Sequence, residues 1–99
     1  MDFATALARQ ELLEQDLTSA GNALRAFPHH PNGLTPDAVR ATPEWRAAKS
    51  RADRAFKALR DYNGVFLKRF ARELRALRDE RDERRRDELR RVIALGNKP

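Results

Sequence analysis

The residues best suited to chemistry in this 99-residue chain are two adjacent histidines, His29 and His30, in a loop bracketed by Pro28 and Pro31. Neighbouring imidazoles can ligate a metal ion, but the sequence has no cysteine, and no cluster of carboxylates accompanies the pair. We therefore predict an exposed loop here, with no metal site and no cofactor.

The acidic residues near the C-terminus are poor candidates for catalysis, because they alternate with arginines. Three pairs are spaced i,i+4 in the orientation that stabilises a solvated helix: Glu80–Arg84, Asp82–Arg86 and Asp87–Arg91. The sequence contains no glycine-rich phosphate loop, no nucleophile elbow and no paired His/Asp spacing. We predict that the protein is not an enzyme.

The net charge of +6 is unevenly distributed along the chain. Residues 1–44 carry a net charge of −3, residues 45–67 carry +4, and residues 68–99 carry +5. A basic region of this kind can bind nucleic acid, an acidic protein surface or an anionic lipid. The apolar face is needed for packing within the chain, which argues against a role at a membrane surface.

Nucleic-acid binding depends on whether basic residues share one face of a helix. The arginines at every third position from Arg69 to Arg84 spread around the whole helix, because each step of three falls about 60° short of a turn. This spread is unsuited to a recognition helix, and the interspersed acids weaken phosphate binding. Non-specific phosphate contact is the alternative, through the basic residues of a region with few acids: Arg46, Lys49, Arg51, Arg54, Lys57, Arg60, Lys68 and Arg69.

The first element that positions these residues is a helix predicted over residues 3–27, with Asp2 as its N-cap. Its apolar residues follow helical spacings: Phe3, Ala6, Leu13, Leu17, Ala20, Leu24 and Phe27. Residues 28–42 are predicted to form a structured elbow with two helix-start signals. In each signal a threonine cap precedes a proline, first at Thr35-Pro36 and then at Thr42-Pro43.

The second large element runs from Thr42 to Leu95 and contains a single glycine before its end, Gly64. Apolar residues recur along its first part at helical spacings: Trp45, Ala48, Ala52, Phe56, Leu59, Phe66, Phe70, Leu74 and Leu77. We favour one continuous helix, because Leu59, Phe66 and Phe70 stay in phase across the glycine. A break at Gly64 gives the alternative, a three-helix bundle.

Together these elements predict an all-α fold, a helical hairpin in which the first helix packs on a very long, charged, coiled-coil-like C-terminal helix. We expect a helical core over residues 1–77 and a charged helical extension over residues 78–99. Five phenylalanines are assigned to the core: Phe3, Phe27, Phe56, Phe66 and Phe70.

The extension ends in an isolated group of apolar residues, which indicates binding to a protein partner or to a second copy in a homodimer. The candidate partner-binding residues are Leu74, Leu77, Leu89, Val92 and Ile93. We predict a small, non-catalytic helical interaction or accessory protein that self-associates or docks on a larger protein. The alternative is a nucleic-acid-binding accessory protein that uses the basic face of residues 46–69.

The N-terminal sequence Met1-Asp2-Phe3 is acidic, and no long apolar run follows it. The sequence therefore predicts neither a signal peptide nor a membrane span. A soluble, cytoplasmic protein is expected.

Overall fold

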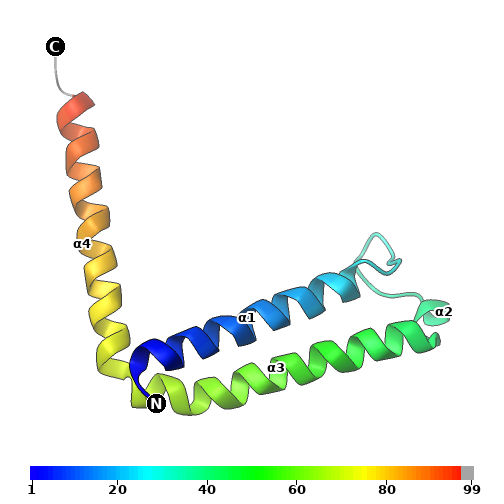
Figure 1. The fold of residues 1–99 in the computed structure, drawn as a ribbon. Helices are drawn as coiled ribbons and strands as arrows, with labels where there is room; N and C mark the ends of the chain where they lie inside the picture. Colours follow the sequence, from blue (N-terminus) through cyan, green and yellow to red (C-terminus); the bar gives the residue numbers. More distant parts are fainter. Residues whose placement is uncertain (97–99) are drawn as a thin grey trace. The chain divides into compact units, whose positions relative to one another are not determined.

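The computed structural model describes residues 1–96, which form four helices (Figure 1). These are α1 (Phe3–Arg25), α2 (Asp37–Arg40), α3 (Pro43–Arg69) and α4 (Ala71–Gly96). No strand occurs among these residues, and α1 packs on α3, so the predicted all-α hairpin is confirmed. The chain divides into two compact units, Met1–Phe66 and the part that begins at Leu67.

Helix α1 begins as predicted, because the backbone N–H of Thr5 donates to Oδ1 of Asp2 over 2.8 Å. Hydrogen bonds from Thr5 lower the pKa of Asp2, and the bond from its side chain has a larger effect than the bond from its backbone. The helix ends at Arg25, two residues before the predicted Phe27. Phe27 precedes Pro28, whose ring disfavours helical geometry in the preceding residue.

The elbow is ordered by a tight turn in the loop before α2. The N–H of Gly33 donates to the carbonyl oxygen of His30 over 2.8 Å, and the N–H of His30 donates to the carbonyl oxygen of Leu34, also over 2.8 Å. Gly33 has a φ of 88°, a left-handed conformation that glycine adopts without steric cost.

Of the two predicted helix starts, one is correct. The hydroxyl of Thr42 accepts a hydrogen bond from the N–H of Trp45 at 3.3 Å, as a cap should. The predicted cap by Thr35 is wrong, because Pro36 itself occupies the N-cap position of α2, with no side-chain cap bond. Its ψ of 145° is extended, so the helix begins one residue later, at Asp37.

Helices α1 and α3 lie side by side and antiparallel (Figure 1). At one end, the rings of Phe3 and Phe66 stack with their centroids 6.3 Å apart. Beside them the hydroxyl of Tyr62 donates to the carbonyl oxygen of Ala6 over 2.7 Å. A phenol buries its ring while its hydroxyl finds a partner at the edge, so Tyr62 fixes the ends of both helices.

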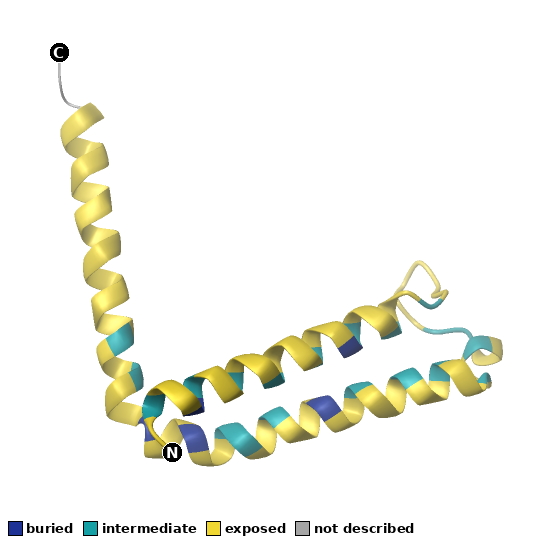
Figure 2. Cartoon of the chain, viewed as in Figure 1, coloured by how far each residue is buried: buried dark blue, intermediate teal, exposed yellow. Residues whose placement is uncertain are grey.

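The seam between α1 and α3 repeats every seven residues, with alternating steps of three and four. In α3 this series is Trp45, Ala48, Ala52, Ala55, Leu59, Tyr62 and Phe66, all buried or half-buried (Figure 2). The most buried positions include three alanines, Ala6, Ala20 and Ala55. Their small side chains allow close approach of two helix backbones, as in a short antiparallel coiled coil.

Phe56 does not belong to this seam, and its assignment to the core is wrong. Its side chain is 55% exposed, whereas Ala55 is 4% exposed. Two successive steps of four, from Ala48 to Ala52 to Phe56, turn about 80° beyond two full turns and leave the seam. The seam takes a step of three at this point and therefore selects the smaller residue.

A pair of side-chain amides crosses the seam between α1 and α3. Nε2 of Gln10 donates to Oδ1 of Asn63 over 2.9 Å, and both side chains are partly buried. A satisfied polar pair in a helical seam favours one register over its neighbours, because a shifted register leaves both amides unpaired.

Helix α3 passes through Gly64 without a break, which excludes the alternative three-helix bundle. The prediction of an unbroken helix to Leu95 is also wrong, because α3 ends at Arg69 and α4 begins at Ala71. No proline or glycine marks this interruption. It comes four residues after Phe66, whose ring stacks on that of Phe3, the first residue of α1.

We expect Gly64→Ala to stabilise the protein by up to about 1 kcal/mol, because alanine is the better helix former. A Cβ at this position meets nothing within 4 Å. The matched substitution Gly33→Ala should instead destabilise, because the φ of 88° strains any residue with a Cβ. Thermal unfolding followed by circular dichroism measures both, and a lower melting temperature for Gly64→Ala would contradict the helical placement.

Candidate partner-binding surfaces

Of the basic residues proposed for phosphate contact, the six in the first compact unit do not share one side of α3. Lys68 and Arg69 belong to the second compact unit, whereas the other six belong to the first. Around the axis of α3, those six spread over about 200°, at 100° per residue. The guanidinium of Arg69 lies over the ring of Phe70, 5.3 Å from its centroid.

Carboxylates also neutralise part of this set. Nζ of Lys49 is 2.9 Å from Oδ1 of Asp53, and a nitrogen of Arg51 is 3.6 Å from Oδ1 of Asp16 on α1. Arg51 also donates to the hydroxyl of Ser19 over 3.2 Å, so it acts as a tie between the two helices. A groove for phosphates needs cations that are free and aligned, and α3 offers few of either.

The candidate partner-binding residues all lie on α4. Leu74 and Leu77 are half-buried, whereas Leu89, Val92 and Ile93 are exposed, Val92 by 67%. Leu74 and Val92 are 18 residues apart, which is five full turns, so they point in the same direction from the helix axis. Leu77 and Leu89 lie about 60° to either side of this line, and Ile93 lies about 100° from it.

Between Leu74 and Val92, the same line of α4 is occupied by arginines. Arg78, Arg81 and Arg85 lie within about 60° of one another around the axis. They line a shallow depression together with Asp82, and the depression continues to Leu74, Ala71 and Leu67, the last of these in the final turn of α3. We call the line from Leu67 through the three arginines and Glu88 to Val92 and Leu95 the α4 stripe.

Sequence reasoning missed the α4 stripe, because it examined arginines at every third residue. A series of equal steps of three circles the helix, whereas alternating steps of four and three stay on one side. The signal was present as Leu67, Ala71, Leu74, Arg78, Arg81, Arg85, Glu88, Val92 and Leu95, which repeats every seven residues.

The ion pairs of α4 lie away from the stripe. Glu80 and Arg84 pair at 2.7 Å, as predicted. Asp87 pairs with Arg90 at 3.6 Å, not with Arg91. In the part of the chain that the structure describes, none of the three stripe arginines has an ion pair, so their charges are available to a partner.

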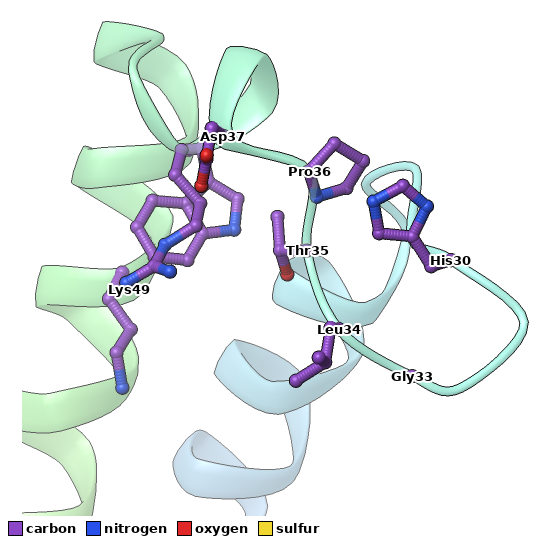
Figure 3. A pocket seen from close by; sticks show the side chains of 9 residues that line it. His30, Gly33, Leu34, Thr35, Pro36, Asp37 and Lys49 are labelled. Atoms are coloured by element: carbon purple, nitrogen blue, oxygen red, sulfur yellow. The ribbon is translucent and has the colours of Figure 1, made fainter.

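A second depression, of about 490 Å³, lies at the elbow (Figure 3). The loop contributes His30 and Leu34, and α3 contributes Lys49 and Trp45. The guanidinium of Arg40 lies 5.8 Å from the centroid of the Trp45 ring, a cation–π contact that closes one wall. Nζ of Lys49, in the same lining, is paired with Oδ1 of Asp53.

His29 and His30 lie in the loop after α1. Both are exposed, and Nδ1 of His29 is 3.3 Å from the carbonyl oxygen of Phe27. Over residues 1–96, no group of three histidine, aspartate or glutamate side chains is placed to hold a metal ion. Among the same residues, no helix has the length and apolarity needed to cross a membrane.

No family model, curated protein or solved structure matches this chain.

Proposed function

We propose that this chain is a small, non-catalytic helical interaction protein. In this proposal the α1–α3 hairpin is a folded scaffold, and α4 carries the surface that binds another protein. The observation that supports it best is the group of exposed apolar residues at the end of α4, where Leu89, Val92, Ile93 and Leu95 are each more than half exposed. Clustered apolar side chains on the surface of a small protein commonly mark a binding site.

The composition of α4 supports the same proposal. In α4, apolar and charged residues share one side of the helix, and the other sides are solvated. Helices of this kind commonly bind in a groove of a partner protein or beside a partner helix. The pairs Glu80–Arg84 and Asp87–Arg90 help to keep the helix formed before the partner arrives. A preformed helix loses less conformational entropy on binding.

Nucleic-acid binding through α3 has less support. Lys49 and Arg51 are held by Asp53 and Asp16, and the remaining cations point in several directions. This arrangement favours weak, salt-sensitive contact with phosphates over a defined interface.

A photo-crosslinking amino acid at Val92 tests the proposal in the cells that produce the protein. We expect an adduct with one or a few proteins, identified by mass spectrometry. The control places the same amino acid at Leu12 on α1, which is 58% exposed and should give none of these adducts. Adducts with nucleic acid alone, no adduct, or the same adducts from both positions would contradict the proposal.

A further inference from the structure

The α4 stripe has a chemical pattern that defines its partner more closely than exposure alone. Its first part is apolar, with Leu67, Ala71 and Leu74. Its centre carries three arginines followed by Glu88, and its last part returns to apolar residues at Val92 and Leu95. Within α4, from Ala71 to Leu95, the stripe extends over about 36 Å at 1.5 Å per residue, a length that one partner helix can cover.

From this pattern we infer that the α4 stripe binds an acidic amphipathic helix of another protein, one with carboxylates at the centre of its seam and apolar residues at both ends. The inference rests on the proposed function and names its partner class. Carboxylates suit the centre because arginine donates to them through two parallel N–H groups. Every cationic side chain of α4 is an arginine, so this geometry is present at all three central positions.

A second copy of the chain is less complementary in charge to the α4 stripe than an acidic helix is. Two parallel copies place each stripe arginine against its own counterpart. The antiparallel register that matches Leu74 with Val92 sets Arg78 against Glu88 but Arg81 against Arg85, and symmetry repeats this contact. Like charges at facing positions of a helical seam select against pairing. An acidic helix meets all three arginines without repulsion when its carboxylates face them and an apolar or basic residue faces Glu88.

A nucleic acid also satisfies the arginines but leaves the ends of the stripe without a role. Leu67, Leu74 and Val92 continue the same line, and phosphates gain nothing from apolar contact with them. The opposite side of α4 carries Asp79 and Glu83, which repel a polyanion that surrounds the helix. Because arginines and apolar residues lie together along the α4 stripe, a protein helix is a better partner than a nucleic acid.

The test uses the full-length protein and a labelled synthetic helix of about four heptads, with glutamates at the central seam positions and leucines at the outer ones. Fluorescence anisotropy should show saturable binding that weakens with added salt, because exposed ion pairs are screened. A control peptide with lysines in place of the central glutamates should not bind. Equal binding of both peptides, or binding of neither, overturns the inference.

Matched variants locate the site. Replacing Arg78, Arg81 and Arg85 together by glutamine should weaken peptide binding by about tenfold, since each exposed pair contributes modestly. Replacing Arg72, Arg86 and Arg90 by glutamine removes the same charge from the other side of α4 and should change the affinity less than about twofold. Circular dichroism must show equal helicity for both. A loss that is equal in the two variants overturns the stripe as the site.

The other occupants have their own readouts. Light scattering that reports a dimer, abolished by the Arg78, Arg81 and Arg85 substitutions, assigns the stripe to a second copy and overturns the inference. Tight binding of a 20-base-pair DNA duplex that the same substitutions abolish, together with no peptide binding, overturns it in favour of nucleic acid. If Val92 still forms adducts with a protein in cells, the proposed function survives these outcomes, so the two failures are distinguishable.

Discussion

Replacing Phe66 by alanine is expected to destabilise the protein by about 3–5 kcal/mol, the usual range for a buried phenylalanine. Phe66 is 2% exposed and stacks on Phe3, and its ring lies 5.5 Å from that of Tyr62. The stability of a small domain is itself about 5–15 kcal/mol, so the variant should retain little of it. Urea unfolding followed by circular dichroism measures the loss.

Phe56→Ala is the matched control, with the same chemical change ten residues earlier in α3. Its side chain is 55% exposed, so the expected loss is below about 1 kcal/mol. If the two variants lose the same stability, the seam does not follow the series through Ala55.

The second large effect is expected from Ala20→Leu. Ala20 has no exposed surface and lies in the seam between α1 and α3, so three additional carbon atoms must force the helices apart. Overpacking of this kind usually costs about 1–3 kcal/mol. The same denaturation experiment applies, and higher stability in the variant would show an unfilled cavity where the structure has close contact.

Ala23→Leu provides the control on the same helix. Ala23 is exposed, and leucine and alanine are both good helix formers. We expect a change below about 0.5 kcal/mol for this variant. A large loss here would point to an effect on the helix itself, not on the seam.

Much of the fold could be predicted because caps, prolines and apolar spacing agree with one another. Asp2 and Thr42 mark helix starts through their side-chain oxygens, and α1 stays in phase from Phe3 to Leu24. The register of α3 was harder. Alanine gives a weak hydrophobic signal, so the sequence alone favoured Phe56 over Ala55 as the residue that faces α1. Only the packing of α1 on α3 shows which of the two lies in the seam. The interruption at Phe70 has no local signal in the sequence, because neither a proline nor a glycine marks it.

Part of the proposed binding surface could be derived from the sequence. Its apolar residues were found as an isolated group, because they follow a run of charges. The stripe arginines were not found, because their relation to Leu74 appears only when the heptad is extended through the charged run. The partner, the absence of catalysis and the cytoplasmic location stay predictions.

The position of the elbow also sets the order in which the hairpin assembles. The contact between Arg51 and Ser19 joins residues 32 positions apart, whereas the contact between Tyr62 and Ala6 joins residues 56 positions apart. The entropic cost of closing a loop rises with the length of chain enclosed. Contacts between α1 and α3 should therefore form first beside the elbow and then toward the chain ends. We therefore expect the aromatic cluster around Phe66 to form late, after the transition state. Substitutions in this cluster should therefore act mainly by speeding unfolding, whereas substitutions beside the elbow should slow folding.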